Sequence, residues 1–221
     1  MHVKICGITT LEDANRACEL GADMLGLNFY AQSPRYIKPE AAKVMVATLR
    51  AKFGAACPTL VGVFVNAPAS SISIIMHSIG LDFAQLSGDE SEVLVSKLGG
   101  KGFKSIQPPT TAKALEEAQY YAPSFPSSEH APALLLDAYH PALRGGTGGS
   151  VGVELARAVQ AVVPRLMLAG GLTADNVAER IKEIQPWGVD VASGVESRPG
   201  LKDTAKMRDF IQSAKQAFAK S

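Results

Sequence analysis

Short, strongly apolar segments alternate with longer segments of helical periodicity along the chain. Eight of the short segments are rich in Val, Ile and Leu. We predict that each forms a β-strand: residues 2–6, 23–29, 59–65, 82–86, 103–107, 133–137, 165–169 and 189–193. Their apolar residues run almost continuously, which is typical of parallel strands that helices cover. We therefore expect a buried parallel sheet, and not an antiparallel sheet with one face in water.

Helix start and stop signals lie between these segments. Thr10 precedes residues 11–13 as in a capping box, with Asp13 at the third position, and Gly21 is expected to end that helix. Pro39 at a first turn predicts a second helix, and Pro68 introduces a third over 70–79. Three more helices are predicted: from Thr110 to about Tyr121, over 174–184 after Thr173, and over 204–219 after Asp203.

Strand followed by helix, repeated eight times in 221 residues, predicts an α/β fold of the (β/α)8 or TIM-barrel class. No segment has the composition of a linker, so we predict a single domain over residues 1–221. A doubly wound open sheet is the structural alternative, although it usually needs fewer strands. In a barrel, functional groups lie at the carboxyl ends of the strands and in the loops that follow them.

Composition and charge exclude several classes of protein. Apolar residues make up 47% of the chain, and 22 basic residues nearly balance 21 acidic ones, so the net charge of +1 predicts no nucleic-acid or membrane partner. No apolar run reaches the roughly 18 residues of a transmembrane helix. The first ten residues do not resemble a secretory signal. Three cysteines without CxxC spacing favour a reducing cytoplasm, and the scattered histidines predict no metal site.

Two strand ends carry a candidate acid–base pair. Cys6 ends the first predicted strand and Asp137 ends the sixth. A thiol can accept a proton if nearby cations lower its pKa, and Lys4 lies on the same strand face. A carboxyl group that faces an enclosed pocket can act as an acid. From spacing alone, a small core residue remains the commoner interpretation of such a cysteine, and we assign Cys18 and Cys57 to that class.

Glycines after the last two strands suggest a phosphate site. Gly170 and Gly171 follow the seventh strand, and Ser193 and Gly194 follow the eighth. Glycine allows close backbone approach to a ligand, and free N–H groups there favour an anion. Barrels often bind phosphate with these two loops, although either glycine pair alone could be a tight turn.

Three other positions and one loop complete the candidates. Arg35 follows the second strand, Gln85 ends the fourth and Asp190 lies in the eighth, and we assign all three to substrate binding. Residues 144–150 are dense in glycine but lack both the P-loop and the dinucleotide spacing. We interpret Gly146, Thr147 and Gly148 as part of a lid that closes over substrate. A merely flexible loop is the alternative.

Motifs spread over the chain resemble the phosphoribosylanthranilate isomerase family of tryptophan biosynthesis. They occur in the family's order: KICGIT (4–9), LGLNFYAQSPRYI (25–37), VGVFVN (61–66), LLLDA (134–138), GGTG (145–148), LAGGLTADNV (168–177) and VDVASGVESRPGLKD (189–203). The first and last of these motifs are specific.

The resemblance implies a fold, a reaction and residue roles. The fold is a (β/α)8 barrel, and the reaction is the Amadori rearrangement of N-(5-phosphoribosyl)anthranilate to 1-(2-carboxyphenylamino)-1-deoxyribulose 5-phosphate, without cofactor or metal. Cys6 is then the general base, Asp137 the general acid, and Arg35 faces the anthranilate carboxylate. The resemblance leaves open whether the chain is a monomer or a homodimer.

Three departures from the family pattern keep alternatives open. Where the family usually shows QLHG, this chain has Ser87 in place of the histidine, and Gly149 stands where GTGK has lysine. The fifth strand ends in Gln107-Pro108, where lysine-Ala is common nearby in the family. One alternative is therefore another phosphosugar isomerase or epimerase on the same barrel. The other is a non-catalytic barrel that binds a phosphorylated ligand.

Overall fold

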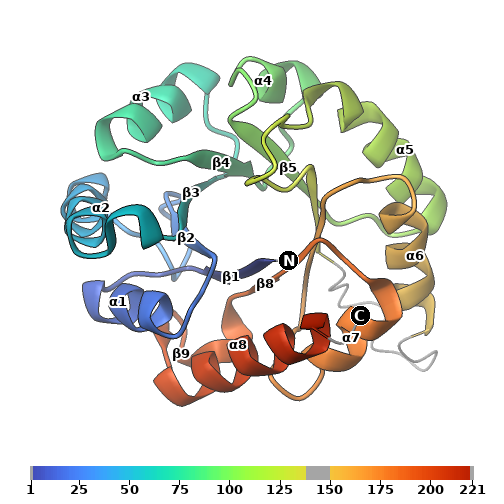
Figure 1. The fold of residues 1–221 in the computed structure, drawn as a ribbon. Coiled ribbons are helices and arrows are strands. Elements are labelled where there is room, and N and C mark those ends of the chain that lie inside the picture. The colour runs from blue at the N-terminus through green and yellow to red at the C-terminus, as the bar shows by residue number, and fades with distance from the viewer. Residues whose placement is uncertain (1, 138–149, 220–221) are drawn as a thin grey trace.

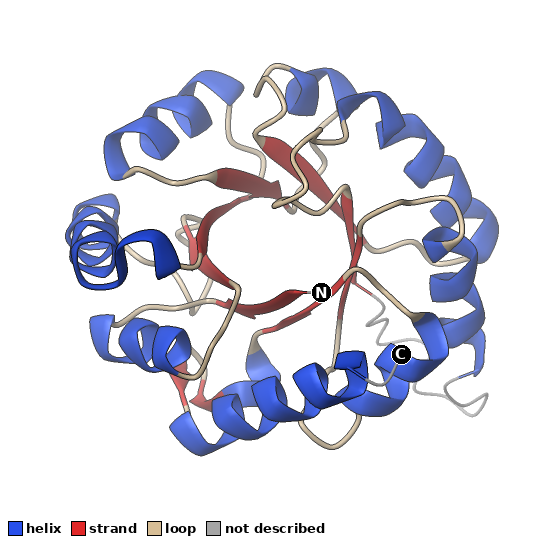
Figure 2. Ribbon diagram, viewed as in Figure 1, coloured by secondary structure: helices blue, strands red, loops and turns tan. Residues whose placement is uncertain are grey.

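Eight parallel strands close into a barrel, with each strand hydrogen-bonded to its neighbours in chain order (Figures 1 and 2). The computed structural model describes residues 2–137 and 150–219. The strands are β1 (His2–Cys6), β2 (Met24–Asn28), β3 (Thr59–Phe64), β4 (Phe83–Leu86), β5 (Gly102–Ile106), β6 (Leu134–Asp137), β7 (Leu166–Ala169) and β8 (Gly188–Val191). Because β1 pairs with both β2 and β8, the predicted barrel is confirmed and the open sheet is excluded.

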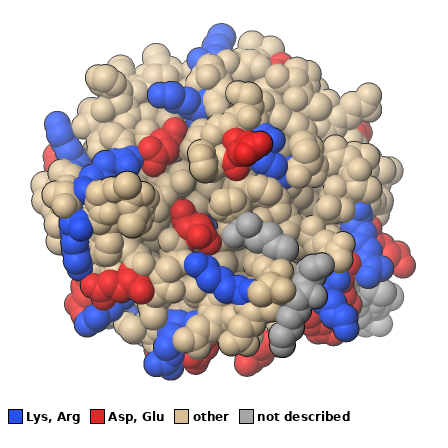
Figure 3. Space-filling view, viewed as in Figure 1, with Lys and Arg blue, Asp and Glu red and all other residues tan. Residues whose placement is uncertain are grey.

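Helices surround the barrel on its outside (Figure 2). They are α1 (Leu11–Glu19), α2 (Pro39–Phe53), α3 (Ala69–Ile79), α4 (Glu92–Ser96), α5 (Thr111–Tyr121), α6 (Ser150–Gln160), α7 (Val177–Ile184) and α8 (Thr204–Ala219). Short 3-10 turns follow α2, α5 and β8: η1 (Gly54–Ala56), η2 (Ala122–Ser124) and η4 (Ser193–Val195). No helix within 2–137 or 150–219 is long and apolar enough to cross a membrane. On the face shown in Figure 3, acidic and basic side chains are interspersed.

Side chains at the predicted caps explain where several elements begin. Thr10 accepts a hydrogen bond from the Asp13 N–H at 3.1 Å, which confirms the start of α1. Asp13 does not complete the capping box, because its carboxylate accepts the Lys202 N–H at 3.2 Å. Asp203 likewise caps α8 by accepting the Lys206 N–H at 3.0 Å.

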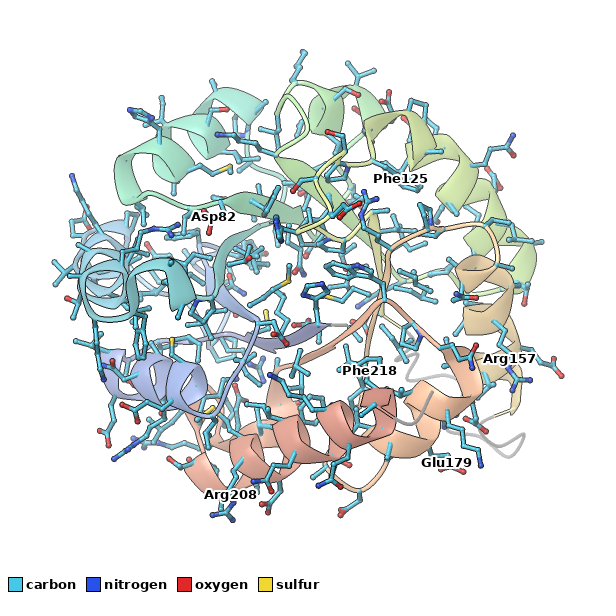
Figure 4. All side chains as sticks on the ribbon, in the orientation of Figure 1. Asp82, Phe125, Arg157, Glu179, Arg208 and Phe218 are labelled. Carbon is cyan, nitrogen blue, oxygen red and sulfur yellow. The ribbon has the colours of Figure 1, made fainter. Side chains whose placement is uncertain are left out.

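Four predicted strands, β2, β4, β6 and β7, start one residue later than expected. Before two of them, an aspartate is bonded to an adjacent strand. Asp23, before β2, accepts the Val3 N–H of β1 at 2.8 Å. Asp82, before β4 and labelled in Figure 4, accepts the Leu60 N–H of β3 at 2.8 Å. Each carboxylate thus accepts a hydrogen bond from a backbone N–H near the amino end of a neighbouring strand, so that this N–H does not remain without a partner.

The predicted helix over 174–184 begins later than expected, and the hairpin after β8 was not predicted. Asn176 accepts the Thr173 N–H at 2.8 Å, so residues 174–176 form a turn and α7 begins only at Val177. The prediction that the glycine loop leads straight into a helix is therefore wrong by one turn. After η4, the strands β9 (Glu196–Arg198) and β10 (Leu201–Lys202) form an unpredicted two-stranded hairpin.

Apolar residues fill two separate layers. One large cluster packs the outward faces of the strands against the helices, and Leu27, Leu136 and Leu168 belong to it. A smaller cluster lies inside the barrel: Met24, Val61, Phe83, Phe103, Ala131, Leu135, Met167 and Ala169. Side chains fill the ring of strands in Figure 4. The lower barrel is consequently a packed core, and the polar groups lie above it, toward the carboxyl ends of the strands.

We predict that truncating the layer between sheet and helices destabilises the protein more than an identical change at the surface. Leu168 on β7 is 1% exposed, whereas Leu115 on α5 is 37% exposed. Leu168→Ala should lower the free energy of unfolding by about 2–5 kcal/mol, because it leaves a cavity. Leu115→Ala should change it by about 0.5 kcal/mol or less. Urea unfolding of both variants measures the difference, and equal losses would contradict this account of the core.

Candidate active site

Cys6 is the last residue of β1, and its side chain points into the barrel. It pairs in register with Gly26 of β2, and a Cβ atom added at Gly26 would lie 2.7 Å from the Cys6 Sγ. Only glycine at position 26 leaves room for the thiol in this orientation. Cys6 is 9% exposed, so the thiol is nearly excluded from water.

A fully buried ammonium group lies two residues before the thiol on the same strand face. Lys4 donates hydrogen bonds to Gln85 Oε1 at 2.7 Å and to Asp190 Oδ1 at 3.0 Å. Three strands that are distant in sequence, β1, β4 and β8, thus meet at one charge. The structure brings Gln85 and Asp190 together, and both accept hydrogen bonds from Lys4. The Gln85 amide also donates to the Ser87 hydroxyl at 3.1 Å.

Burial controls how the thiol titrates. Loss of water raises the pKa of Cys6 above its ordinary value, although Lys4 and Lys202 act in the opposite direction. Lys4, the cation that the sequence suggested as an activator, is therefore present together with Lys202, but burial outweighs the effect of both on the pKa of the thiol. Burial also disfavours the charged form of Lys4, yet Asp190 and Cys6 together raise the pKa of Lys4, so that it stays an ammonium group.

Arg35 is held in place by a buried carboxylate. Its Nε and Nη2 donate to the two oxygens of Glu196 at 2.8 and 2.7 Å. Lys202 donates to Glu196 Oε1 at 3.0 Å. Burial raises the pKa of Glu196, but the hydrogen bond from Arg35 and the charge of Lys202 outweigh it and hold the pKa below its usual value. The arginine packs closely on Gly7, where an added Cβ would lie 2.5 Å from Arg35 Cδ.

Glu196 and Lys202 were not among the residues predicted from the sequence. Both lie in the motif over 189–203, so the signal that could have indicated them was their place in a specific motif. Their side chains meet because the hairpin of β9 and β10 turns back toward the barrel mouth. Lys202 also donates to the Ala192 carbonyl at 3.0 Å, which anchors the loop after β8.

Asp137 ends β6 at the wall of a cavity of about 1070 Å³. Gln85, Ser87, Gln107 and Asp190 also line this cavity. The Gln107 amide donates a hydrogen bond to Oδ2 of Asp137. Cys6 is not among the residues that line the cavity, and it is connected to it through Lys4, whose two partners lie in the wall.

A second cavity, of about 480 Å³, lies between the loops after β7 and β8. It is lined by all four predicted phosphate-binding residues, Gly170, Gly171, Ser193 and Gly194, and by Asp137 and Asp190. Gly170 and Gly171 have φ of +95° and +64°, a region that favours glycine. A Cβ at Gly194 would lie 1.9 Å from the Leu172 carbonyl oxygen, so glycine is required where the two loops touch.

A buried ion pair joins the larger cavity to the loops after β3 and β4. Lys104 donates to Glu90 at 3.0 Å. Glu90 in turn accepts the backbone N–H groups of Asn66 at 2.7 Å and Gly88 at 2.9 Å, so the loops after β3 and β4 share one anchor. Sequence reasoning missed this pair, because both residues have the appearance of ordinary surface charges.

The remaining predictions concern the lid and metal binding. The predicted lid residues Gly146, Thr147 and Gly148 lie outside the described residues. Within 2–137 and 150–219, no three His, Cys, Asp or Glu side chains are grouped so that they could hold a metal ion.

Comparisons with known proteins agree with this architecture. The family model for N-(5'-phosphoribosyl)anthranilate (PRA) isomerase matches residues 3–213. The isomerase of that name from Trichlorobacter lovleyi is 43% identical over 218 residues, covering 99% of this chain and 100% of the relative. The one from Geobacter sp. (strain M21) is 44% identical, covering 96% and 97%.

Solved structures of the same kind superpose along the whole length. The phosphoribosyl anthranilate isomerase of Thermotoga maritima has a TM-score of 0.83 at 34% identity, covering 98% of this chain and 99% of that one. A second similar structure (TM-score 0.81, 32% identity, the same coverage) is a phosphoribosyl anthranilate isomerase in complex with reduced 1-(o-carboxyphenylamino)-1-deoxyribulose 5-phosphate. On this evidence the chain belongs to the N-(5'-phosphoribosyl)anthranilate isomerase family.

Proposed function

We propose that Cys6 and Asp137 are the general base and general acid of the aldose-to-ketose rearrangement that this isomerase of tryptophan biosynthesis catalyses. The substrate is N-(5'-phosphoribosyl)anthranilate. The observation that carries the assignment is the pair of connected cavities: Asp137 and Asp190 line both, and Asp190 binds the Lys4 that lies beneath Cys6. The shared lining residues and the contact from Asp190 through Lys4 toward Cys6 support a single site that involves both groups.

The reaction begins at the ring oxygen. Asp137 donates its proton to the furanose oxygen, the bond between that oxygen and C1 breaks, and the anthranilate nitrogen forms a Schiff base with C1. A half-buried carboxyl group at a strand end suits this role, because its position is set by the barrel and its proton is renewed in each turnover. The hydrogen bond from Gln107 orients the carboxyl group.

The second step takes place at C2. The Cys6 thiolate removes the C2 proton, which gives an enolamine, and tautomerisation of the enolamine gives the ketone. Burial makes the thiolate scarce at neutral pH, and the positive charges of Lys4 and Lys202 favour it when it forms. A thiolate without a water shell is also a stronger base, so burial has a catalytic benefit as well as a cost.

The ends of the substrate fit the two remaining features of the site. Arg35 donates hydrogen bonds from Nε and Nη2 to Glu196. Its third nitrogen, Nη1, would then bind the anthranilate carboxylate. The loops that contain Gly170, Gly171, Ser193 and Gly194 would bind the 5-phosphate with backbone N–H groups. Binding energy from these non-reacting ends would then position C1 and C2 between the acid and the base. Gln85 and Asp190 would act through Lys4.

We further propose that the enzyme works in the cytoplasm. Its three cysteines are all free, and a reducing compartment keeps thiols in that form.

The catalytic assignment predicts the effect of removing either group. Cys6→Ala and Asp137→Asn should each lower kcat by about 10²-fold or more, the low end for a general acid or base. Loss of substrate fluorescence measures turnover, and Cys57→Ala serves as the matched control, since Cys57 lies in a distant loop. Unchanged turnover in either active-site variant would reject its role.

Rescue of a tryptophan auxotroph that lacks this isomerase separates the alternatives. Rescue by the wild-type chain is expected. If the protein folds but does not rescue growth, another phosphosugar substrate is favoured. If the folded protein turns over no phosphosugar substrate, the non-catalytic binding protein is favoured.

The thiol environment predicts a shift in titration. Lys4 favours the thiolate, so Lys4→Met should raise the pKa of Cys6 further and move thiolate formation to higher pH. The ultraviolet absorbance of the thiolate measures this in a Cys18→Ser/Cys57→Ser background. Lys43→Met, at an exposed position of α2, should leave the midpoint unchanged. A midpoint that moves to lower pH in Lys4→Met would contradict the proposed electrostatics.

The phosphate assignment predicts a loss of binding without a loss of chemistry. Gly194→Ala forces a Cβ against the Leu172 carbonyl and should spread the two loops. KM should rise, and thermal stabilisation by inorganic phosphate should weaken. Gly152→Ala is the control, because nothing lies within 4 Å of a Cβ at that position. If both variants keep the stabilisation, phosphate binds elsewhere.

A further inference from the structure

We infer that Gln107 positions the general acid: its amide donates a hydrogen bond to Oδ2 of Asp137 and fixes the orientation of the carboxyl group. This inference rests on the proposed function, in which Asp137 is the acid, and it assigns to Gln107 a role that acts through Asp137.

The register of two neighbouring strands brings the two side chains together. In the parallel pairing of β5 with β6, Ser105 lies beside Leu135 and Ile106 beside Leu136. The next residues along the strands, Gln107 and Asp137, are therefore neighbours on the same face. Leu135 belongs to the cluster inside the barrel, so side chains two residues further on also face inward. Both Gln107 and Asp137 line the larger cavity, as this geometry requires.

The sequence after Gln107 makes its position rigid. Pro108 and Pro109 follow it directly. A residue before proline is restricted to extended backbone, and two prolines in succession fix their own φ angles. The Gln107 side chain thus starts from a constrained backbone position, although it lies in an exposed part of the cavity wall. A fixed backbone position suits a positioning role, because it limits the backbone freedom that is lost when the amide binds the carboxyl group.

The chemistry of an amide suits a group that gains and loses a proton in each turnover. The Gln107 N–H donates to Oδ2. An oxygen that accepts this hydrogen bond is a poorer place for the acid proton, so the amide distinguishes the two oxygens of the carboxyl group. Lysine or arginine in the same place would favour the ionised carboxylate strongly, and the acid would then be slow to recover its proton. A neutral donor orients the carboxyl group without that penalty.

Other charged groups share the cavity and are unchanged by a substitution at position 107. They lie on the elements around Asp137: Asp89 and Lys104 on the side of β4 and β5, Lys113, Glu116 and Glu117 on α5, and Asp190 on β8. A control variant must therefore alter the polarity of this cavity without contacting Asp137. Gln119 meets that condition, because it lines the same cavity from α5 and is exposed.

The test compares Gln107→Leu with Gln119→Leu in steady-state turnover over a range of pH. Gln107→Leu should lower kcat about 10-fold, the rate factor that corresponds roughly to the loss of one hydrogen bond to a charged group. KM should change little. The limb of the pH profile that reports Asp137 should move to higher pH, because the carboxylate loses a donor. Gln119→Leu should match the wild type in both respects. Equal effects of the two substitutions, or a wild-type kcat and profile in Gln107→Leu, would overturn the inference.

Two further variants keep the outcome decisive. Gln107→Glu keeps the shape of the side chain and replaces the donor with a second carboxyl group, so the same limb should move to higher pH by more than in Gln107→Leu. A limb that stays in place in a folded Gln107→Glu would also overturn the inference. Asp137→Asn is measured alongside. If Asp137→Asn retains turnover, the assignment of Asp137 as the acid is wrong. If Asp137→Asn is inactive while the Gln107 variants have the kcat and pH profile of the wild type, only the role of Gln107 is rejected.

Discussion

A single buried ammonium group organises the interior of this barrel. Lys4 has no exposed surface, and its charge is stable there only because Asp190 and Gln85 accept its hydrogen bonds. Removing one partner of such a pair typically costs about 3–5 kcal/mol, since it leaves an uncompensated charge in a medium of low polarity. The first, fourth and eighth strands must therefore keep their relative positions for the charge to be tolerated, and these are strands whose ends form the site.

The same charge links stability to chemistry. The thiol of Cys6 lies on the same strand face as Lys4, in a space that Gly26 keeps open. Burial opposes ionisation of the thiol and Lys4 favours it, so the reactivity of Cys6 depends on two opposing effects that the barrel sets together. A surface thiol would ionise more easily, but a thiolate in water would be a weaker base toward a carbon acid.

Two further buried carboxylates support the loops around the site. Glu196 joins Arg35 to Lys202 across the first and last parts of the chain, and Glu90 joins Lys104 to two loop N–H groups. Each carboxylate is buried and satisfied by several donors, an arrangement that fixes geometry more than it adds stability. The two loops of the smaller cavity depend instead on glycine, because their backbones approach too closely for a Cβ.

The amino-acid sequence by itself determined the eight strands, most of the helices and the strand ends at which function lies. Those features follow from local patterns: continuous apolar runs, cap residues and glycine pairs. The sequence also indicated Cys6, Asp137 and the glycine loops, because a barrel brings all strand ends to one face. Only the tertiary structure decided which side chains meet. Lys4 with Asp190, Arg35 with Glu196, and Gln107 with Asp137 are separated by 186, 161 and 30 residues, and strand register and the closure of the barrel bring them together. Register and burial are properties of the folded chain, so neither these pairs nor the raised pKa of Cys6 could be read from local spacing.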